Sequence, residues 1–368
     1  MLKNRVEAVI NTANLKHNFA LIRSLAGDSR VISVVKADAY SHGAVECARI
    51  IEECGGDMFA VATAHEGAEL RLGGIKGDIL VLGISLGEDI ALLNRYDLIQ
   101  AVDSAEYADE IAKASVDIRI HIKLDTGMSR LGFYCHKCAD IPQTFLLVKN
   151  AVSHPSLRLE GIFTHFACSE EQDNPMTCRQ FEVFRSFCDY CRQNGLDVGL
   201  RHCCNSAAII NFPEMRLDAV RAGIILYGLE PDQGLAKKSS FLPCMSLIAG
   251  IIQITKIKKG DTVSYGAAFT ADRDMTIATL SIGYADGFSR SLSGIGDVLI
   301  NGVRAPIIGK ICMDMCMADV SNIDCAVGDE AIVFGDGKSV NELAELEGTI
   351  NYEVICNSVR LRTVRRYI

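Results

Sequence analysis

The fold is decided by the stretch VISVVKADAY at residues 31–40. Its first half is apolar and β-branched, which predicts a buried strand, and Lys36 follows that strand directly. An open, doubly wound nucleotide-binding sheet usually places a G-x-G-x-x-G turn after its first strand, and no such motif stands here. The stretch therefore favours a closed barrel of β/α units over an open sheet.

Similar β-branched stretches recur along the first two thirds of the chain. Segments of helical length lie between most of them, for example residues 43–54, 64–72 and 177–194. Eight β/α units in about 230 residues fit a (β/α)8 barrel of the TIM type. The predicted strands are residues 31–35, 58–62, 78–83, 98–102, 118–124, 159–166, 200–205 and 220–227.

The remainder of the chain predicts a mostly β second domain. Residues 251–257 and 275–282 are short β-rich runs, and turn signals at 258–261 and 335–338 predict hairpins. One helix is expected near residues 340–346. We therefore expect a barrel over residues 1–235 and a β-rich domain over residues 236–368.

Composition excludes several classes of function. The chain has 368 residues, 49% hydrophobic and 23% charged, which is typical of a globular protein with more than one domain. The net charge of −9 and the lack of a basic cluster disfavour binding to nucleic acid or to anionic membranes. No apolar run is long enough to span a bilayer, and the N-terminus does not look like a secretory signal, so a cytoplasmic location is expected.

The 15 cysteines include two C-x-x-C pairs, Cys135/Cys138 and Cys188/Cys191. Zinc ligands occur at this spacing. However, the second pair lies in a segment with helical apolar periodicity, and the odd total argues against a disulfide framework. Buried thiols in a reducing compartment are the favoured interpretation, and no metal site is predicted.

Several polar residues fall where the predicted barrel strands end. Catalytic groups of such barrels lie at the carboxyl ends of the strands, and phosphate sites often follow the last two. A lysine in an apolar setting has a lowered pKa and forms Schiff bases. A lysine facing a phosphate site is what a pyridoxal phosphate (PLP) enzyme requires. The residues concerned are Lys36, Lys123, Asp125, Arg130, His165, Ser206, Arg221 and Gly223.

The motifs around these residues resemble those of alanine racemases. VVKADAYSHG at residues 34–43 is similar to the family's PLP-lysine signature, and KLDTGMSRLGF at 123–133 continues the match. Further matching segments occur in family order over nearly the whole chain. They are residues 163–167, 205–208, 221–228, 263–266, 282–287, 312–314 and 351–354.

The resemblance implies a two-base racemase that interconverts L- and D-alanine with PLP as cofactor, supplying D-alanine for peptidoglycan. Lys36 would hold the cofactor and move the proton on one face of the substrate, and Tyr265 would act on the other face. One base on each side is what exchange at Cα requires. The family's homodimer implies that Tyr265 and Met313 reach the barrel of the partner subunit.

The resemblance also implies the groups that bind cofactor and substrate. Arg130 and the backbone amide of Met313 would bind the substrate carboxylate. Lys123, if carbamylated, would give Arg130 an anionic partner, and His165 would link Tyr265 to Arg221. The cofactor phosphate would be held by Tyr40, Ser206, Gly223, Ile224 and Tyr352. Asp314 and Tyr284 lie in matching motifs and would support the site.

Arg221 bears on the type of reaction. The resemblance places it against the pyridine nitrogen of PLP, where a charged arginine keeps that nitrogen unprotonated. The ring is then a weaker electron sink, which suits simple return of the proton. Related barrel-type decarboxylases have an acidic residue in this role.

Three departures from the family pattern leave alternatives open. Ser41 stands where the family usually has glycine, residues 9–12 lack the usual acidic residues, and the tail at 356–367 is spaced differently. Serine racemases of the glycopeptide-resistance type share these motifs and are often fused to a membrane domain, so serine is the alternative substrate. A noncatalytic PLP-binding barrel protein and a PLP-dependent decarboxylase are further alternatives. The second domain argues against the noncatalytic protein, because that class resembles only the barrel.

Overall fold

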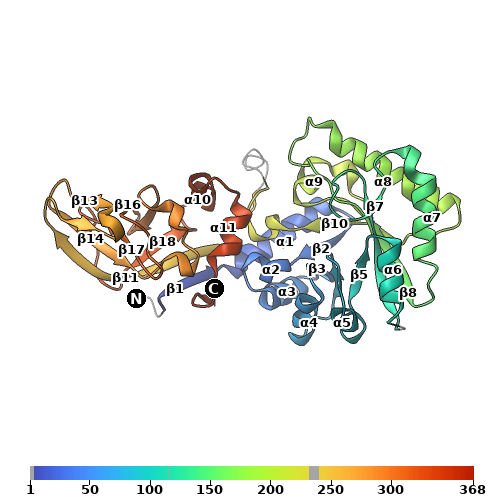
Figure 1. Ribbon diagram of the computed structural model, residues 1–368, viewed down its shortest axis with the longest axis horizontal. Helices are drawn as coiled ribbons and strands as arrows, with labels where there is room; N and C mark the ends of the chain where they lie inside the picture. Colours follow the sequence, from blue (N-terminus) through green and yellow to red (C-terminus); the bar gives the residue numbers. More distant parts are fainter. Residues whose placement is uncertain (1–3, 115, 232–239) are drawn as a thin grey trace. The chain divides into compact units, whose positions relative to one another are not determined.

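The computed structural model describes residues 4–114, 116–231 and 240–368. The chain divides into two compact units (Figure 1). Asn14–Ala39 and Ala44–Leu242 form the barrel unit, whereas Met1–Ala13, Tyr40–Gly43 and Pro243–Ile368 form the sheet unit. The predicted boundary between residues 235 and 236 lies outside the described residues and stays a prediction.

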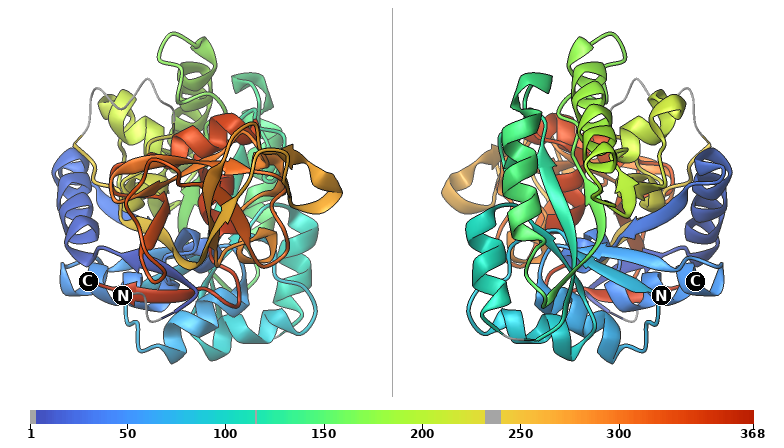
Figure 2. Two further views of the ribbon diagram at one scale, coloured as in Figure 1. Left: turned by 90° about the vertical axis from the view of Figure 1, so that its left-hand side faces the viewer. Right: turned by 90° about the vertical axis from the view of Figure 1, so that its right-hand side faces the viewer.

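The barrel unit confirms the predicted fold class. Eight parallel strands pair in the order β5-β4-β3-β2-β10-β9-β8-β6, and β5 also pairs with β6, which closes the barrel. The helices surround these strands in the right-hand view of Figure 2. The strands are β2 (Arg30–Val34), β3 (Met58–Val61), β4 (Asp78–Val81), β5 (Ile99–Val102), β6 (Ile118–Asp125), β8 (Leu157–Phe163), β9 (Leu200–His202) and β10 (Ala219–Ala222).

Helices follow most of these strands, as the alternating pattern predicts. The first helix, α1 (Thr12–Ala26), precedes β2, but its Asn18 side chain donates a hydrogen bond to the carbonyl of Leu226 beyond β10. It therefore occupies the place of the helix after the last strand. The others are α3 (Ala44–Glu53), α4 (Ala64–Leu72), α5 (Asp89–Arg95), α6 (Ala105–Ala112), α7 (Ile141–Ala151), α8 (Pro175–Gln193) and α9 (Ser206–Asn211), with the 3-10 turns η1 (Cys138–Asp140), η2 (Pro213–Met215) and η3 (Ile224–Tyr227).

A network of ion pairs lies at the amino ends of the barrel strands. Arg30 at the start of β2 and Arg119 in β6 both contact Asp78 at the start of β4, at 2.8 and 2.6 Å. Arg119 also contacts Glu160 in β8 at 2.9 Å. The two arginines hold the pKa of Asp78 below its usual range although burial opposes them. This end of the barrel is thus tied together by charge, and the opposite end carries the candidate site.

The sheet unit is built around the long strand β11 (Met245–Ile257). Its first half pairs with β1 (Val6–Ile10) and β18 (Glu330–Phe334), and its second half pairs with β14 (Met275–Leu280). The pairing with β14 closes a ring whose order is β14-β17-β16-β15-β18-β11. The ring also contains β15 (Asp297–Ile300), β16 (Val303–Ile308) and β17 (Cys316–Asp319), while β12 (Thr262–Val263) and β13 (Phe269–Thr270) form a separate ribbon.

Two predictions, one for the N-terminal segment and one for the turn after β11, were wrong. The N-terminal segment was expected in the barrel, but β1 pairs with β11 and with β19 (Val364–Tyr367) at the C-terminus. The turn at 258–261 forms, with Asp261 N–H donating to Lys258 O, but it leads into the β12–β13 ribbon and does not make a hairpin with β11. For β1 the deciding contacts are strand pairings over long sequence distance, which local patterns do not encode. For the turn, the deciding contact is the short-range pairing of β12 with β13.

The turn and the helix predicted for the rest of the sheet unit are both present. Gly335 and Lys338 exchange backbone hydrogen bonds across the turn predicted there. The predicted helix is α10 (Val340–Glu347), and it begins at a capping box formed by Ser339 and Glu342. A further helix, α11 (Asn351–Ser358), was not predicted.

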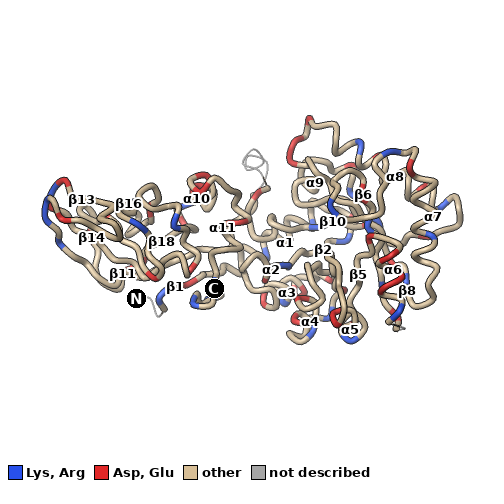
Figure 3. Tube along the Cα trace, viewed as in Figure 1, with Lys and Arg blue, Asp and Glu red and all other residues tan. Residues whose placement is uncertain are grey.

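Charge placement agrees with the sequence analysis, whereas the prediction of buried thiols is confirmed only in part, because Cys138 of the first C-x-x-C pair is exposed. Figure 3 shows basic and acidic residues interspersed along the chain. Within the described ranges, each helix is too short or too polar to cross a lipid bilayer. Cys188 and Cys191 are buried in α8, as predicted, and burial raises the pKa of each thiol to about 12. No trio of His, Cys, Asp or Glu side chains among the described residues is placed to bind a metal ion.

Candidate active site

Lys36 begins a turn of unusual backbone conformation. The segment labelled α2 (Lys36–Tyr40) is left-handed: Ala37, Asp38 and Ala39 have φ of 51–54° and ψ of 47–48°. Tyr40 and Ser41 continue with φ of 51° and 68°. Each such residue costs an L-amino acid about 1–2 kcal/mol, and strain of this kind concentrates at functional sites. The positive φ of Ser41 is a conformation that glycine adopts without strain.

Strand β6 directs three polar side chains to one face. His121, Lys123 and Asp125 alternate along the strand and are all buried. Burial, reinforced by Arg130 and Arg221, lowers the pKa of Lys123 to about 8, and its ammonium lies 5.7 Å from the ring centre of Phe163. With a pKa of about 8, about a tenth of this amine is neutral at pH 7.

The loop after β6 is held by Asp125 and leaves Arg130 available. One oxygen of Asp125 accepts hydrogen bonds from the backbone of Gly127, Met128 and Ser129, at 2.9–3.1 Å. Arg130 is exposed, and it makes no hydrogen bond or ion pair with any described residue. The loop thus presents a guanidinium that is free to bind an anion.

Arg221 in β10 is buried and almost fully hydrogen-bonded. One terminal nitrogen donates to the Nδ1 and carbonyl of His202, at 2.8 and 3.0 Å. The other donates to the carbonyls of Thr164 and Cys203, at 2.7 and 3.0 Å, and lies 3.3 Å from Nδ1 of His165. Burial lowers the pKa of Arg221 to about 10, which leaves it charged. Of the N–H groups of the Arg221 guanidinium, only Nε–H has no acceptor among the described residues.

A chain of hydrogen bonds extends from Arg221 into the barrel interior. Because arginine only donates, Nδ1 of His202 accepts and Nε2 carries the proton. This Nε2 lies 3.0 Å from Nδ1 of His121, which must then accept in turn. Burial is the main cause that lowers the pKa of His121 to about 3 and that of His202 well below its usual value, so both rings are neutral.

His165 follows β8 and has the same constraint. Its Nδ1 accepts a longer, shared hydrogen bond of 3.3 Å from the Arg221 nitrogen that also donates to two carbonyls, so its Nε2 carries the proton and is a donor. Burial and the positive charge of Arg221 lower the pKa of His165 well below its usual value. The backbone here is fixed by Gln180 of α8, which donates to the carbonyl of His165 and accepts from Ala167 N–H.

The candidate phosphate site of the barrel lies after β9 and β10. Ser206 is buried at the start of α9, and its hydroxyl accepts a hydrogen bond of 2.9 Å from Gly223 N–H. Ile224 follows at the start of η3. The structure therefore brings together Ser206 and Gly223, which lie 17 residues apart in the sequence.

In the sheet unit, Tyr40 and Tyr352 lie together. Their ring centres are 6.1 Å apart, and Tyr352 lies in the unpredicted helix α11. Tyr40 is 7% exposed, and burial raises the pKa of its hydroxyl. Tyr40 is therefore protonated at neutral pH and able to donate a hydrogen bond.

Tyr265 and Met313 are exposed in the sheet unit. They are 71% and 53% exposed, and neither the Tyr265 hydroxyl nor the Met313 N–H has a hydrogen-bond partner among the described residues. The backbone of Met313 is held by the segment Tyr284–Asp286: Ala285 N–H donates to Met313 O at 3.0 Å. This approach requires glycine at 283, since a Cβ there would lie 2.3 Å from the carbonyl of Cys312.

Asp314 is fixed by its own ion pair. Arg362 contacts its carboxylate at 2.5 Å, and Arg5 donates to its carbonyl at 2.7 Å. Arg362 also contacts the fully buried Asp286 at 2.9 Å, and Asp286 follows Tyr284 in the same turn. These contacts join the two segments that carry Met313 and Tyr284.

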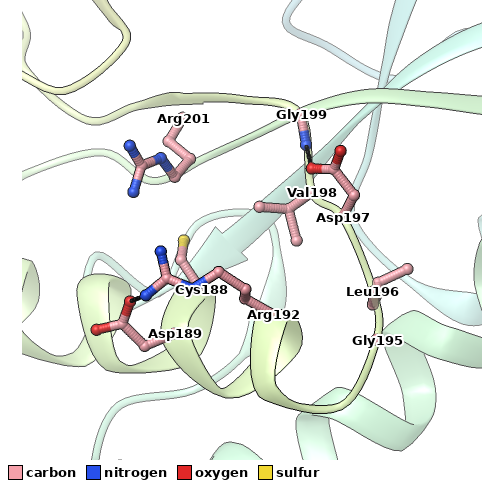
Figure 4. A pocket seen from close by; sticks show the side chains of 9 residues that line it. All are labelled: Cys188, Asp189, Arg192, Gly195, Leu196, Asp197, Val198, Gly199 and Arg201. Atoms are coloured by element: carbon pink, nitrogen blue, oxygen red, sulfur yellow. Dashed lines mark hydrogen bonds and ion pairs between the residues drawn. The ribbon is translucent and has the colours of Figure 1, made fainter.

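The cavities of the barrel unit do not all coincide with this chemistry. A cavity of about 500 Å³ lies between the end of α8 and the start of β9 (Figure 4). It lies at the amino end of β9, its Arg192 contacts Asp189, and Arg201 contacts Asp218. Another cavity of about 510 Å³ is lined by residues of the loop after β6, the loop that carries Arg130. Only the second lies at the carboxyl ends of the strands.

PLP fits the groups that the barrel unit offers. Its pyridine nitrogen accepts a hydrogen bond only when unprotonated, and the Nε–H of the buried Arg221 side chain has no protein acceptor in the described ranges. Lys36 supplies the amine at the end of β2, and Ser206 supplies a hydroxyl after β9. Sequence analysis missed His121, His202 and Gln180. His121 stands two residues before Lys123, and side chains two apart in a strand point to the same face, so the sequence could have revealed His121.

Comparison with known proteins covers both units. Residues 10–231 match the family model described as alanine racemase, N-terminal domain, and residues 244–367 match that of the C-terminal domain. The chain is 42% identical to an alanine racemase of Clostridium tetani, over 99% of this chain and 95% of that one. It is 41% identical to an alanine racemase of Methanococcus maripaludis over the full length of both.

Solved structures give the same result. An alanine racemase of Clostridium difficile 630 is similar with a TM-score of 0.94 and 36% identity, covering 100% of this chain and 97% of that chain. The alanine racemase of Bacillus anthracis with bound L-Ala-P has a TM-score of 0.92 and 33% identity, covering 100% and 96%. With both domains matched and two relatives above 40% identity over at least 95% of their length, the chain belongs to the alanine racemase family.

Proposed function

We propose that this chain interconverts L-alanine and D-alanine with PLP as cofactor, with Lys36 and Tyr265 as its two proton-transfer groups. The observation that carries the proposal is the buried guanidinium of Arg221, with all terminal N–H groups engaged and Nε–H left over. When bound, PLP makes the Cα proton of an attached amino acid acidic. A charged arginine at the pyridine nitrogen limits further electron withdrawal, which favours return of the proton over loss of carbon dioxide.

Lys36 and Tyr265 exchange protons at opposite faces of Cα. Lys36 takes or returns the proton on one face, and Tyr265 of the partner subunit does so on the other. Tyrosine ordinarily titrates near pH 10, so the phenolate needs a donor nearby. The protonated Nε2 of His165, whose Nδ1 is directed to Arg221, supplies that donor. The homodimer is part of this proposal because it brings Tyr265 and Met313 to the barrel.

The substrate carboxylate binds to Arg130 and to the Met313 amide. Both groups lack a partner among the described residues, which supports these roles. Lys123, with its lowered pKa, reacts as a neutral amine with carbon dioxide to form a carbamate and release a proton. The carbamate then orients Arg130. Tyr284 and Asp314 hold the loop of Met313.

The cofactor phosphate is held by hydroxyl and backbone groups. The Ser206 and Tyr40 hydroxyls would donate to it, together with Tyr352 and the amide of Ile224. Gly223 would contribute by donating its N–H to the oxygen of Ser206, which leaves the Ser206 proton for the phosphate. The high pKa of Tyr40 supports donation to an anion. We further propose that the product supplies D-alanine for peptidoglycan, and that the enzyme acts in the cytoplasm.

The test is a pair of assays with L-alanine and L-serine in the presence of PLP, following the D-enantiomer. D-alanine is expected as the faster product, because the relatives at about 40% identity are named alanine racemases and do not favour the serine alternative. Release of carbon dioxide would support a decarboxylase, and bound PLP without exchange at Cα would support a noncatalytic protein. Failure to racemise either amino acid would overturn the proposal.

A further inference from the structure

The structure gives Glu66, at the start of α4, a second function in addition to capping its own helix. One carboxylate oxygen, Oε2, accepts from Ala62 N–H at 2.6 Å and from Thr63 N–H at 3.3 Å. Thr63 returns a hydrogen bond through its hydroxyl to Glu66 N–H at 3.2 Å, which completes a capping box. These contacts are local to the beginning of α4 and use only one of the two oxygens.

The other oxygen contacts the turn that follows a different strand, β2. Oε1 of Glu66 accepts a 2.7 Å hydrogen bond from the backbone N–H of Ala37, the residue after Lys36. Ala37 is the first residue of the left-handed turn, where φ turns positive three residues after the end of β2. A left-handed run without glycine is unfavourable for L-residues and persists only where surrounding contacts impose it. The Glu66 carboxylate is such a contact at the point where the run begins.

We propose that Glu66 is a positioning residue for Lys36. By binding Ala37 N–H, the carboxylate fixes the peptide that joins Lys36 to the left-handed turn, and thereby the direction in which Lys36 leaves β2. Glu66 touches neither cofactor nor substrate in this assignment. The inference rests on the proposed role of Lys36 as the lysine that holds PLP.

A second carboxylate in the chain shows how to separate the two functions of Glu66. Asp140 in η1 accepts from His136 N–H at 3.1 Å and from Lys137 N–H at 3.0 Å through one oxygen. These donors stand four and three residues before it, as Ala62 and Thr63 stand before Glu66. The shorter aspartate side chain therefore satisfies this local arrangement, but at position 66 it falls one methylene short of Ala37.

The test compares Glu66→Asp with the wild-type full-length chain. Apparent PLP affinity, the yield of Lys36 modified after borohydride reduction, and hydrogen exchange at the Ala37 amide are measured together. Loss of one charge-assisted hydrogen bond predicts PLP binding weaker by about tenfold or more, and faster exchange at Ala37 by a similar factor. Thermal stability should stay close to that of the wild type, because the cap of α4 is retained.

Two further variants sharpen the result. Glu342→Asp changes the equivalent capping-box residue of α10, where one oxygen binds Ser339 N–H and the other Arg304, so PLP binding should not change. Glu66→Gln keeps the length but turns one acceptor into a donor facing a backbone N–H, so it should weaken binding as Glu66→Asp does.

The outcomes separate this inference from the proposed function. If wild-type chain binds PLP through Lys36 and Glu66→Asp matches it within twofold with unchanged Ala37 exchange, Glu66 has no positioning role. If the wild type does not form an adduct at Lys36, the proposed function fails. The exchange rate at Ala37 still decides whether Glu66 holds the turn.

Discussion

Replacing His202 by phenylalanine tests whether the buried histidine chain holds Arg221. The His202 ring is fully buried and stacks on Phe163 with ring centres 4.9 Å apart and planes 5° apart. Phenylalanine keeps this stacking surface but removes the acceptor for Arg221 and the donor to His121. Arg221 keeps its bond to the carbonyl of residue 202. We therefore expect a loss of about 2–5 kcal/mol in the free energy of unfolding at pH 7.5.

The pH dependence of the free energy of unfolding gives a second quantity to compare. The pKa values of His121, His165 and His202 are all lowered on folding, so each binds fewer protons in the folded than in the unfolded state below about pH 6.5. Stability is therefore full above that pH and falls as the pH drops towards the folded pKa values. One such histidine contributes a slope of about 1.4 kcal/mol per pH unit, and three contribute about 4. His202→Phe should reduce the slope by about a third.

The assay is urea unfolding of the wild type and the variant from pH 7.5 to 5 at one protein concentration, since association also affects stability. His154→Phe serves as the control. It changes a partly exposed histidine in a surface ion pair with Asp109, so the loss at pH 7.5 should stay below about 1 kcal/mol. A His202→Phe variant with the stability and the slope of the wild type would refute the hydrogen-bonded chain.

Three other predictions concern proton transfer, carbamylation and packing. Tyr265→Phe should slow solvent-deuterium exchange at Cα of L-alanine by a factor of about 10²–10⁴ while PLP absorbance survives; an unchanged rate would remove Tyr265 from its role. The neutral fraction of Lys123 grows as the pH rises through about 8, so bicarbonate should add one carboxyl mass more completely at pH 9 than at pH 7, and Lys123→Met should abolish that addition. An adduct that survives in Lys123→Met would place the carbamate elsewhere. Gly161→Ala puts a Cβ 2.6 Å from the ring of His121. It should lower the free energy of unfolding, measured by thermal unfolding, by about 1–3 kcal/mol, and adding His121→Ala should restore part of that loss. An unchanged stability of Gly161→Ala would show that the ring moves freely.

Much of the fold could be predicted because it is encoded locally. Most barrel strands are short runs of buried residues rich in β-branched side chains, and several helices between them begin at a side-chain cap, such as Thr63 at α4 and Ser104 at α6. The carboxyl ends of parallel strands must meet, so Lys36, Lys123 and Arg221 could be assigned to one end of the barrel before any contact was known. The position of β1 could not be predicted in this way, because its partners β11 and β19 lie more than 200 residues away.

The candidate site also has some features that the sequence determines and others that only the tertiary structure decides. The sequence by itself determined the fold class, the family and the residue types available for proton transfer, because motifs and periodicity are properties of neighbouring residues. The tertiary structure alone decided the environments: the left-handed turn after Lys36, the Nε–H of Arg221 that no described residue accepts, the neutral rings of His121 and His202, and the contact of Glu66 with Ala37. These depend on burial and on hydrogen-bond direction between residues far apart in the chain, and only packing fixes either.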